Sequence, residues 1–168
     1  VLLACTWVVG TQSLSPKMIF VMAIIAGGDS GIGINTGHEL GHKDTKLEKW
    51  LAKIVLAVPA YAHFSIEHNK GHHKHVSTPE DPASSRMGES IYSFALREMP
   101  GTMKRGWQLE RERLVKANKP VWSHHNEILQ SYALTTAIQV GLVIYFGWIV
   151  LPFLLVHNFW AWFQLTSA

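Results

Sequence analysis

Apolar residues gather near both ends of the chain, and a polar, charged section separates them. The first apolar run covers residues 1–10, and a second covers residues 18–37, although Asp29 interrupts it. The longest run, residues 132–156, contains no charged residue and is long enough to cross a bilayer as a helix. These three runs predict membrane-spanning helices in an all-α, polytopic helical bundle.

Small residues recur at Gly33, Gly37 and Gly41, every four positions toward the end of the second run. Such a stripe lets another helix approach closely. Asp29 lies in a Gly-Gly-Asp-Ser-Gly sequence, so we expect it to mark a local break in the helix rather than an intramembrane functional group.

The polar section, about residues 38–131, carries nearly all of the positive charge. Fourteen of the fifteen Lys and Arg residues lie between Lys43 and Lys119, and the exception is Lys17. Because cytoplasmic loops of membrane proteins carry an excess of positive charge, we expect this section to face the cytoplasm. Its basic residues do not alternate with aromatic ones in a stacking pattern, so no nucleic-acid partner is expected.

Composition narrows the class of protein further. With 168 residues, of which 16% are charged, the chain fits one domain, 1–168, and is poorer in charge than the soluble average of about 25%. The one cysteine, Cys5, excludes an intrachain disulfide framework and a thiolate-rich zinc or iron–sulfur site. Because the chain starts inside an apolar run without an initiator Met, we expect an internal fragment of a longer protein.

Seven of the ten histidines lie in the first half of the chain. His38 and His42 are four residues apart, so on a helix both imidazoles project from one face and can bind one metal ion. His68 and His72 repeat this spacing, and His73 lies one step around the helix. Imidazole is the commonest protein ligand for borderline transition metals, so these five residues are the candidate ligands.

Five imidazoles are too many for a tetrahedral zinc ion, which favours a dinuclear, nitrogen-rich centre. Iron suits imidazole ligation and oxygen chemistry, whereas zinc has no redox role; copper also accepts imidazole, so ligand type alone does not decide for iron. Glu39 and Glu67 adjoin the candidate ligands. They are candidate acceptors that would orient imidazole rings, and either could equally face solvent.

The first histidine box also reads His38-Glu39-x-x-His42, the zinc-protease signature in which the glutamate acts as general base. At the end of a membrane helix, this motif suggests an intramembrane zinc protease. Such an enzyme needs one further ligand and one water position, and it has no use for a second histidine cluster. The protease is therefore kept as a remote alternative.

Residues 50–66 form a shorter apolar segment, which contains Lys53 and has Pro59 near its centre. If this segment crossed the bilayer once, His42 and His68 would lie on opposite sides of about 30 Å of hydrocarbon. They could not then share a metal site. We therefore expect the segment to be re-entrant, interfacial or packed against other helices.

The remaining histidines are weaker candidates for metal ligands. His63 precedes the second cluster and is expected to be structural, or else to line the pocket of the site. His75 lies on the opposite helix face and is expected at the surface. His124 and His125 lack the i, i+4 spacing and are expected in an interfacial turn, and His157 is expected at the membrane interface.

These motifs resemble those of the integral-membrane alkane 1-monooxygenase (alkane hydroxylase) family of bacteria. The resemblance is carried by Asn35–Lys43, Glu67–Ser90, Trp122–Ser123, Asn126–Gln130 and Trp162–Ala168. It covers essentially the whole chain, and the second block is long and irregular, so chance is a poor explanation.

The resemblance implies a membrane bundle of the fatty-acid desaturase/hydroxylase type with two histidine-bound, non-haem iron ions. It implies hydroxylation of n-alkanes at the terminal carbon with dioxygen, and electrons delivered by rubredoxin and its reductase. The family's first box maps onto His38 and His42, and its second onto His68, His72 and His73. The remaining ligands are expected to follow the end of this chain, which would then hold a partial site.

Related desaturases and aromatic-methyl monooxygenases share this chemistry and stay open as alternatives. Desaturases generally have a His-x-x-His-His second box, whereas this one is His-x-x-x-His-His. The resemblance further implies a multi-pass protein of the bacterial inner membrane with its histidine boxes on the cytoplasmic side. The basic segment 97–119 could there receive an acidic electron carrier by electrostatic steering.

Overall fold

The computed structural model describes residues 1–166, and within that range it contains helices and no strand. The elements are α1 (Leu2–Thr11), α2 (Pro16–Gly41), α3 (Lys46–Ala57), α4 (Phe64–Glu67), the π-helix η1 (His68–His72), α5 (His73–His75), α6 (Ile91–Lys116), α7 (Glu127–Phe146) and α8 (Val150–Thr166). Ser167 and Ala168, which end one of the segments that carry the resemblance, lie outside the described residues. The predicted all-α class is confirmed.

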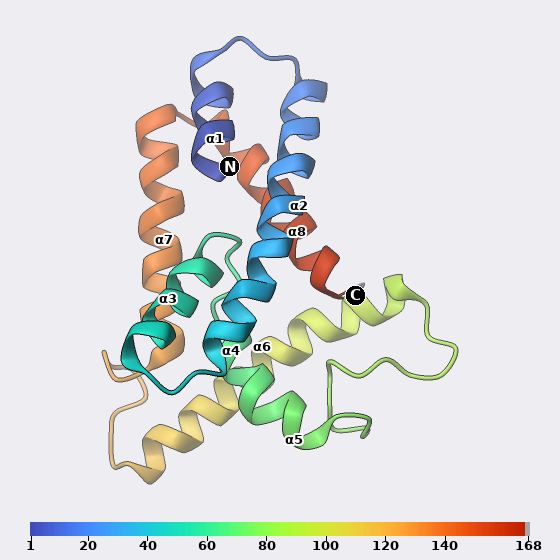
Figure 1. Cartoon of the computed structure of the whole chain (residues 1–168), viewed down its shortest axis with the longest axis vertical. Coiled ribbons are helices and arrows are strands. Elements are labelled where there is room, and N and C mark those ends of the chain that lie inside the picture. Colours follow the sequence, from blue (N-terminus) through green and yellow to red (C-terminus); the bar gives the residue numbers. More distant parts are fainter. Residues whose placement is uncertain (167–168) are drawn as a thin grey trace.

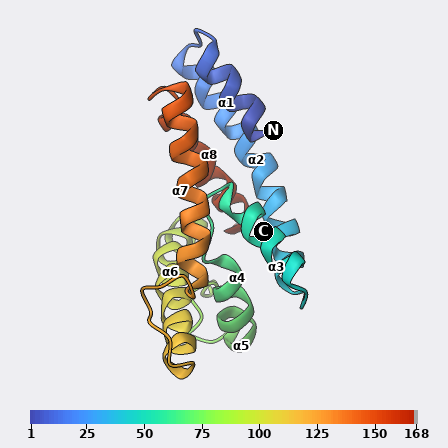
Figure 2. The same cartoon turned by 90° about the vertical axis from the view of Figure 1, so that its left-hand side faces the viewer.

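The helices form an elongated bundle whose two ends differ (Figure 1). Toward one end, α1, α2, α7 and α8 pack against one another, and toward the other end α6 crosses beside α4 and α5 (Figures 1 and 2). Two helices, α2 and α7, are long and apolar enough to cross a membrane. The apolar run at the N-terminus forms α1, which has 10 residues and is too short to span a bilayer by itself.

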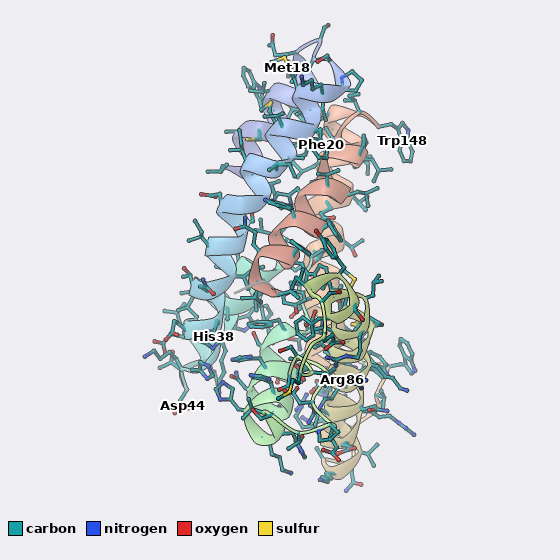
Figure 3. All side chains as sticks on the ribbon, turned by 90° about the vertical axis from the view of Figure 1, so that its right-hand side faces the viewer. Met18, Phe20, His38, Asp44, Arg86 and Trp148 are labelled. Atoms are coloured by element: carbon teal, nitrogen blue, oxygen red, sulfur yellow. The ribbon has the colours of Figure 1, made fainter. Side chains whose placement is uncertain are left out.

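The side chains divide along the same long axis. Figure 3 shows carbon-rich side chains around Met18, Phe20 and Trp148 at one end, and nitrogen- and oxygen-rich side chains near His38 and Arg86 at the other. Met18, Phe20 and Trp148 are exposed in the described chain. Large exposed apolar side chains on apolar helices suit contact with lipid. α2 runs from this apolar end to the polar end of the molecule, where its histidines lie (Figure 3).

The apolar run at 132–156 forms parts of two helices rather than the one span predicted from its lack of charge. α7 begins behind Asn126, whose side chain accepts hydrogen bonds from the backbone N–H groups of Ile128 and Leu129 at 3.0 and 3.1 Å. It ends before Gly147, which has a φ of 86° that favours glycine. The chain turns there, and α8 then packs across α2.

The predicted break at Asp29 is wrong, because α2 is continuous through that position. The helix starts where expected from local signals: Ser15 accepts a hydrogen bond from the N–H of Met18, and Pro16 occupies the first turn. The glycines around Asp29 lower helix propensity, but packing of this stretch against α8 outweighs that preference.

The closest approach between α2 and α8 occurs at two glycines. A methyl group added to Gly27 would lie 2.8 Å from the carbonyl oxygen of His157, and one added to Gly31 would lie 3.1 Å from Cβ of Gln164. The contact at Gly27 is too short for a Cβ atom, and the one at Gly31 would need its neighbour to shift by a few tenths of an ångström. Glycine therefore allows the two helix backbones to come together here.

The glycine stripe predicted further along α2 is confirmed in two of its three members. A methyl group on Gly37 would lie 3.0 Å from Leu56 of α3, and one on Gly41 would lie 3.4 Å from Ser65 of α4. Nothing lies within 4 Å of the corresponding position on Gly33. The segment 50–66 thus packs against α2, which is one of the arrangements expected for it.

His157 is fully buried in α8, so its predicted place at the membrane interface is wrong. Its Nε2 lies 2.8 Å from Oγ of Ser30 on α2, and its Nδ1 lies 2.9 Å from Oδ1 of Asn158. Asn158 and Gln139 of α7 exchange two hydrogen bonds of 3.1 Å through their amide groups. A continuous chain of polar contacts therefore joins three apolar helices, where unpaired polar groups would be costly.

Replacing Gly27 by alanine is expected to destabilise the protein by about 1–3 kcal/mol, because the added methyl group must push α8 away from α2. The matched variant Gly33→Ala, on the same helix with open space around it, should be neutral or stabilising by up to about 1 kcal/mol. Thermal unfolding of both variants in detergent checks this. Equal stabilities for the two variants would contradict the packing described.

Candidate metal centre

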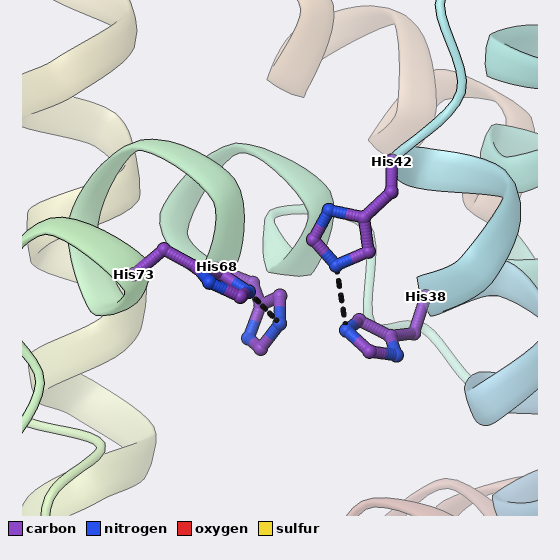
Figure 4. A group of neighbouring side chains, drawn as sticks. All are labelled: His38, His42, His68 and His73. Atoms are coloured by element: carbon purple, nitrogen blue, oxygen red, sulfur yellow. Dashed lines mark hydrogen bonds between the residues drawn. The ribbon is translucent and has the colours of Figure 1, made fainter.

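Four histidines from two separate segments of the chain meet at the polar end of α2 (Figure 4). His38 lies in the last turn of α2 and His42 caps that helix, while His68 begins η1 and His73, the first residue of α5, caps it. One ring nitrogen from each of the four lies within 4.8 Å of the others. This spacing could hold a metal ion between the two boxes.

A side-chain hydrogen bond fixes the two boxes relative to each other. Nδ2 of Asn69, in η1, donates to the carbonyl oxygen of Gly41 at the end of α2, at 2.9 Å. The last carbonyls of a helix have no partner within it, so this bond satisfies one of them. It lies between the histidines of the first box and those of the second.

The second box is wound as a π-helix, which the sequence did not indicate. The N–H of His73 bonds to the carbonyl of His68, five residues earlier, instead of the four typical of an α-helix. As a result His68 and His73 face each other, with 2.9 Å between their Nε2 atoms. The predicted α-helical spacing had paired His68 with His72 instead.

Gly71 lies where the second box contacts α6. A methyl group there would lie 2.8 Å from Oε1 of Glu67 and 3.0 Å from Nε of Arg105 on α6. The glycine between the histidines therefore lets α6 approach the second box. A glycine inside a short histidine cluster was the one available sequence signal for an irregular turn.

His72 lies beside the group of four rather than within it. Its ring stacks on that of His68, with 5.3 Å between centroids, and its Nδ1 lies 2.8 Å from Oδ2 of Asp81. Asp81 is fully buried and also lies 3.6 Å from Nη1 of Arg105. A carboxylate that holds one imidazole nitrogen orients the other, so Asp81 has the position of a ring-orienting acceptor that the sequence analysis missed.

The two glutamates expected to orient imidazoles differ in their surroundings. Glu39 is exposed, and its Oε1 lies 3.4 Å from Nδ1 of His38. Glu67 is buried, and its Oε1 has no hydrogen-bond partner among the described residues. Burial first, and then the nearby charge of Asp81, raise the pKa of Glu67 to about 7 against the opposing charge of Arg105.

The protonation state of His68, in the second box, suits metal binding. Burial and the neighbouring imidazoles lower the pKa of His68 to about 3, so its ring is neutral at pH 7. A histidine must be neutral to coordinate a metal ion. In each box, two ring nitrogens face one another at hydrogen-bond distance, and the ring of His68 is neutral. This arrangement fits a transition metal of the kind that binds imidazole.

A hollow of about 340 Å³ opens beside the histidines. His38, His68 and His72 form one wall. The rest of the lining includes Tyr61, Phe64, Phe94, Glu98 and Leu165. The hollow has the size and the mainly apolar lining of a small-molecule site, with the histidines as its convergent polar groups.

The other histidines lie away from this cluster. His63 is buried, with Nδ1 2.9 Å from the hydroxyl of Tyr132, which agrees with the structural role expected for it. Burial lowers the pKa of His63 to about 4. His124 and His125 lie in the turn before α7, as predicted, and His75 is partly buried rather than fully at the surface.

Sequence comparison relates this chain to known proteins. The fatty acid desaturase family model matches residues 15–168. An alkane 1-monooxygenase from Alcanivorax borkumensis is 50% identical over 99% of this chain, and one from Pseudomonas putida is 51% identical over the same share. A xylene/toluene monooxygenase hydroxylase component of Pseudomonas putida is 31% identical over 66% of this chain.

The chain spans about two-fifths of the length of its alkane 1-monooxygenase relatives, 41% and 42% for the two named here. The matched region of the family model includes both histidine boxes and all of the helices from α2 onward. The family match, the all-helical fold and the meeting of the two boxes agree with one another. This chain therefore belongs to the fatty acid desaturase family.

Proposed function

We propose that this chain is part of a membrane non-haem di-iron monooxygenase that hydroxylates the terminal carbon of n-alkanes to 1-alkanols with dioxygen. The observation that carries the proposal is the meeting of both histidine boxes beside an apolar hollow. The relatives named alkane 1-monooxygenase, at about 50% identity, support the substrate class.

We assign His38, His42, His68, His72 and His73 as iron ligands. Five imidazoles exceed the four positions of a tetrahedral zinc ion, which supports a centre of two iron ions. Bound iron would supply the activation of dioxygen and the oxidation of a C–H bond. The protein would contribute the orientation of the rings and a site protected from water.

The substrate would be held by shape and apolar contact, because an n-alkane has no charge and no hydrogen-bonding group. Phe64, Phe94 and Leu165 line the hollow beside the histidines and would contact the hydrocarbon chain. The apolar helices α2 and α7 support a location in the membrane, where such a substrate accumulates. We assign the histidine boxes to the cytoplasmic side of the bacterial inner membrane, since the positive charges cluster in the same section.

Purified full-length protein is expected to hold two irons per chain and to convert a medium-length n-alkane to its 1-alkanol. His68→Ala should lower iron content and alcohol formation by more than about 100-fold, because it removes the ring that stacks on His72 and meets His73 edge-on. His124→Ala, in a turn away from the cluster, is the matched control and should change neither. Elemental analysis, Mössbauer spectra and product chromatography measure these quantities.

One tightly bound zinc and no iron would overturn the proposal and favour the protease hypothesis. That hypothesis predicts that Glu39→Gln abolishes activity with the metal retained and that His72→Ala has no effect. An iron protein that oxidises aromatic methyl groups would favour the second candidate, which the identity with the xylene/toluene monooxygenase component supports. Desaturation of an acyl chain would favour the desaturase alternative within the same family.

Asp81→Ala is expected to weaken iron binding by about 10–100-fold, because His72 loses the acceptor that orients its ring. Asp81→Asn should recover part of the affinity, since an amide oxygen can still accept a hydrogen bond from Nδ1–H. Iron retention during titration with a chelator measures the affinity. The exposed Asp44 provides the control Asp44→Ala, and equal retention by the two alanine variants would contradict an orienting role for Asp81.

We further propose rubredoxin, reduced by its reductase, as the electron donor, docking on α6. The basic segment identified in the sequence is only partly available to a carrier. Arg113 is bound to Glu110 at 2.6 Å and to the carbonyl of His125 at 2.8 Å, so it has a structural role. Lys104 and Arg111 are exposed, and their seven-residue separation puts them on one face of the helix.

Reversing both charges, Lys104→Glu with Arg111→Glu, is expected to raise the apparent KM for reduced rubredoxin several-fold at low salt. The effect should shrink as ionic strength rises, because salt screens attraction between exposed charges. Lys17→Glu, in the first turn of α2, is the control. Steady-state kinetics at two salt concentrations measure both, and an unchanged KM for the double variant would count against docking on α6.

A further inference from the structure

A second hollow lies behind the one that the histidines line, and Tyr61 belongs to the walls of both. The inner hollow has a volume of about 340 Å³ and the outer one about 410 Å³. The outer hollow is lined mainly by Tyr61, Met99, Met103, Leu155, Phe159 and Trp162. It therefore contains apolar surface from α6 and α8 and none of the candidate metal ligands.

Three buried side chains separate the two hollows, and we call them the partition: Tyr61, Glu98 and Trp162. The hydroxyl of Tyr61 donates to Oε1 of Glu98 at 3.3 Å, and the indole N–H of Trp162 donates to Oε2 at 3.1 Å. The residues are 5%, 5% and 4% exposed, respectively. They come from the loop before α4, from α6 and from α8, so one carboxylate holds three elements together.

The partition is also fixed relative to the histidines. The ring of Tyr61 stacks on Phe64 with 5.1 Å between centroids, and Phe64 stacks on His68 with 4.9 Å between centroids. A continuous aromatic column therefore joins the partition to a candidate iron ligand. Buried rings packed in this way do not move aside without cost, because protein interiors are densely packed.

The outer hollow lies next to the apolar surface of α8. Leu155 and Phe159, which line it, are 61% and 53% exposed in the described chain. α8 carries no charged residue among Val150–Thr166. Tyr61 lines both hollows, Glu98 lines the inner one and Trp162 the outer one, so the partition lies between a hydrocarbon chain in the inner hollow and this second apolar space.

We infer that the partition determines the longest n-alkane that can bind with its terminal carbon at the histidines. The inference rests on the proposed alkane hydroxylation and names the residues that set its substrate range. A short chain ends before the rings of Tyr61 and Trp162, whereas a longer chain meets them. Glu98 is a positioning residue, because it acts by holding those two rings in place.

Removing one ring should join the two hollows and admit the far end of a longer chain. Apolar pockets discriminate by roughly ten- to two-hundred-fold for one methylene group, so opening the partition should have a large effect on selectivity. Trp162→Ala in the full-length protein is therefore expected to raise the ratio of long-chain to short-chain kcat/KM by at least about tenfold. The measurement is competition between n-hexadecane and n-octane, with both alcohols quantified in one reaction.

The control variant is Phe159→Ala, which enlarges the outer hollow without opening the partition and should leave the ratio unchanged. Iron content and melting temperature establish that each variant is folded. Where Trp162→Ala yields no folded protein, Tyr61→Leu removes the other ring and is judged by the same ratio. Tyr61→Phe, which keeps the ring, should stay close to wild type.

The outcomes separate this inference from the proposed function. Wild-type protein that oxidises both alkanes, together with a folded partition variant whose ratio is unchanged, would overturn the inference alone. Wild-type protein that oxidises no alkane of any length would overturn the proposed function and the inference with it. A ratio that rises equally in Phe159→Ala and Trp162→Ala would also overturn the inference, since the partition would then not be the barrier.

Discussion

The hydrogen bond from Asn69 to the carbonyl of Gly41 is the contact on which the candidate centre depends. The Gly41 carbonyl is partly exposed, and a hydrogen bond of this kind contributes about 0.5–1.5 kcal/mol to stability. It joins the end of α2, between His38 and His42, to η1, next to His68. The bond that caps the helix carrying the first box thus also attaches that helix to the second box.

A second contact, made by α6, keeps the second box in its unusual shape. Arg105 donates to the carbonyls of Glu80 at 2.7 Å and Gly71 at 3.2 Å, and it faces the buried carboxylate of Asp81 at 3.6 Å. One guanidinium thus connects α6, the π-helix and the loop that follows α5. Because Gly71 is buried, its carbonyl would lose this donor if the arginine moved.

The parts of this structure that depend on local sequence pattern could be predicted from the sequence. The parts that depend on tertiary contacts could not. The all-α class and the pairing of His38 with His42 followed from hydropathy and helical spacing. The π-turn at His68 did not, because the i, i+4 spacing of His68 and His72 fits a regular α-helix equally well. Likewise the burial of His157 depends on Ser30, which lies 127 positions away in the chain and carries no signal of that contact.

The π-turn has a consequence for how this segment can vary. A π-turn amounts to one extra residue accommodated within a helix, so its length is part of its geometry. Loss of a single residue between His68 and His73 would restore regular α-helical winding and rotate everything beyond it by about 100°. The number of residues in the second box is therefore constrained by its winding, independently of the chemistry of its side chains.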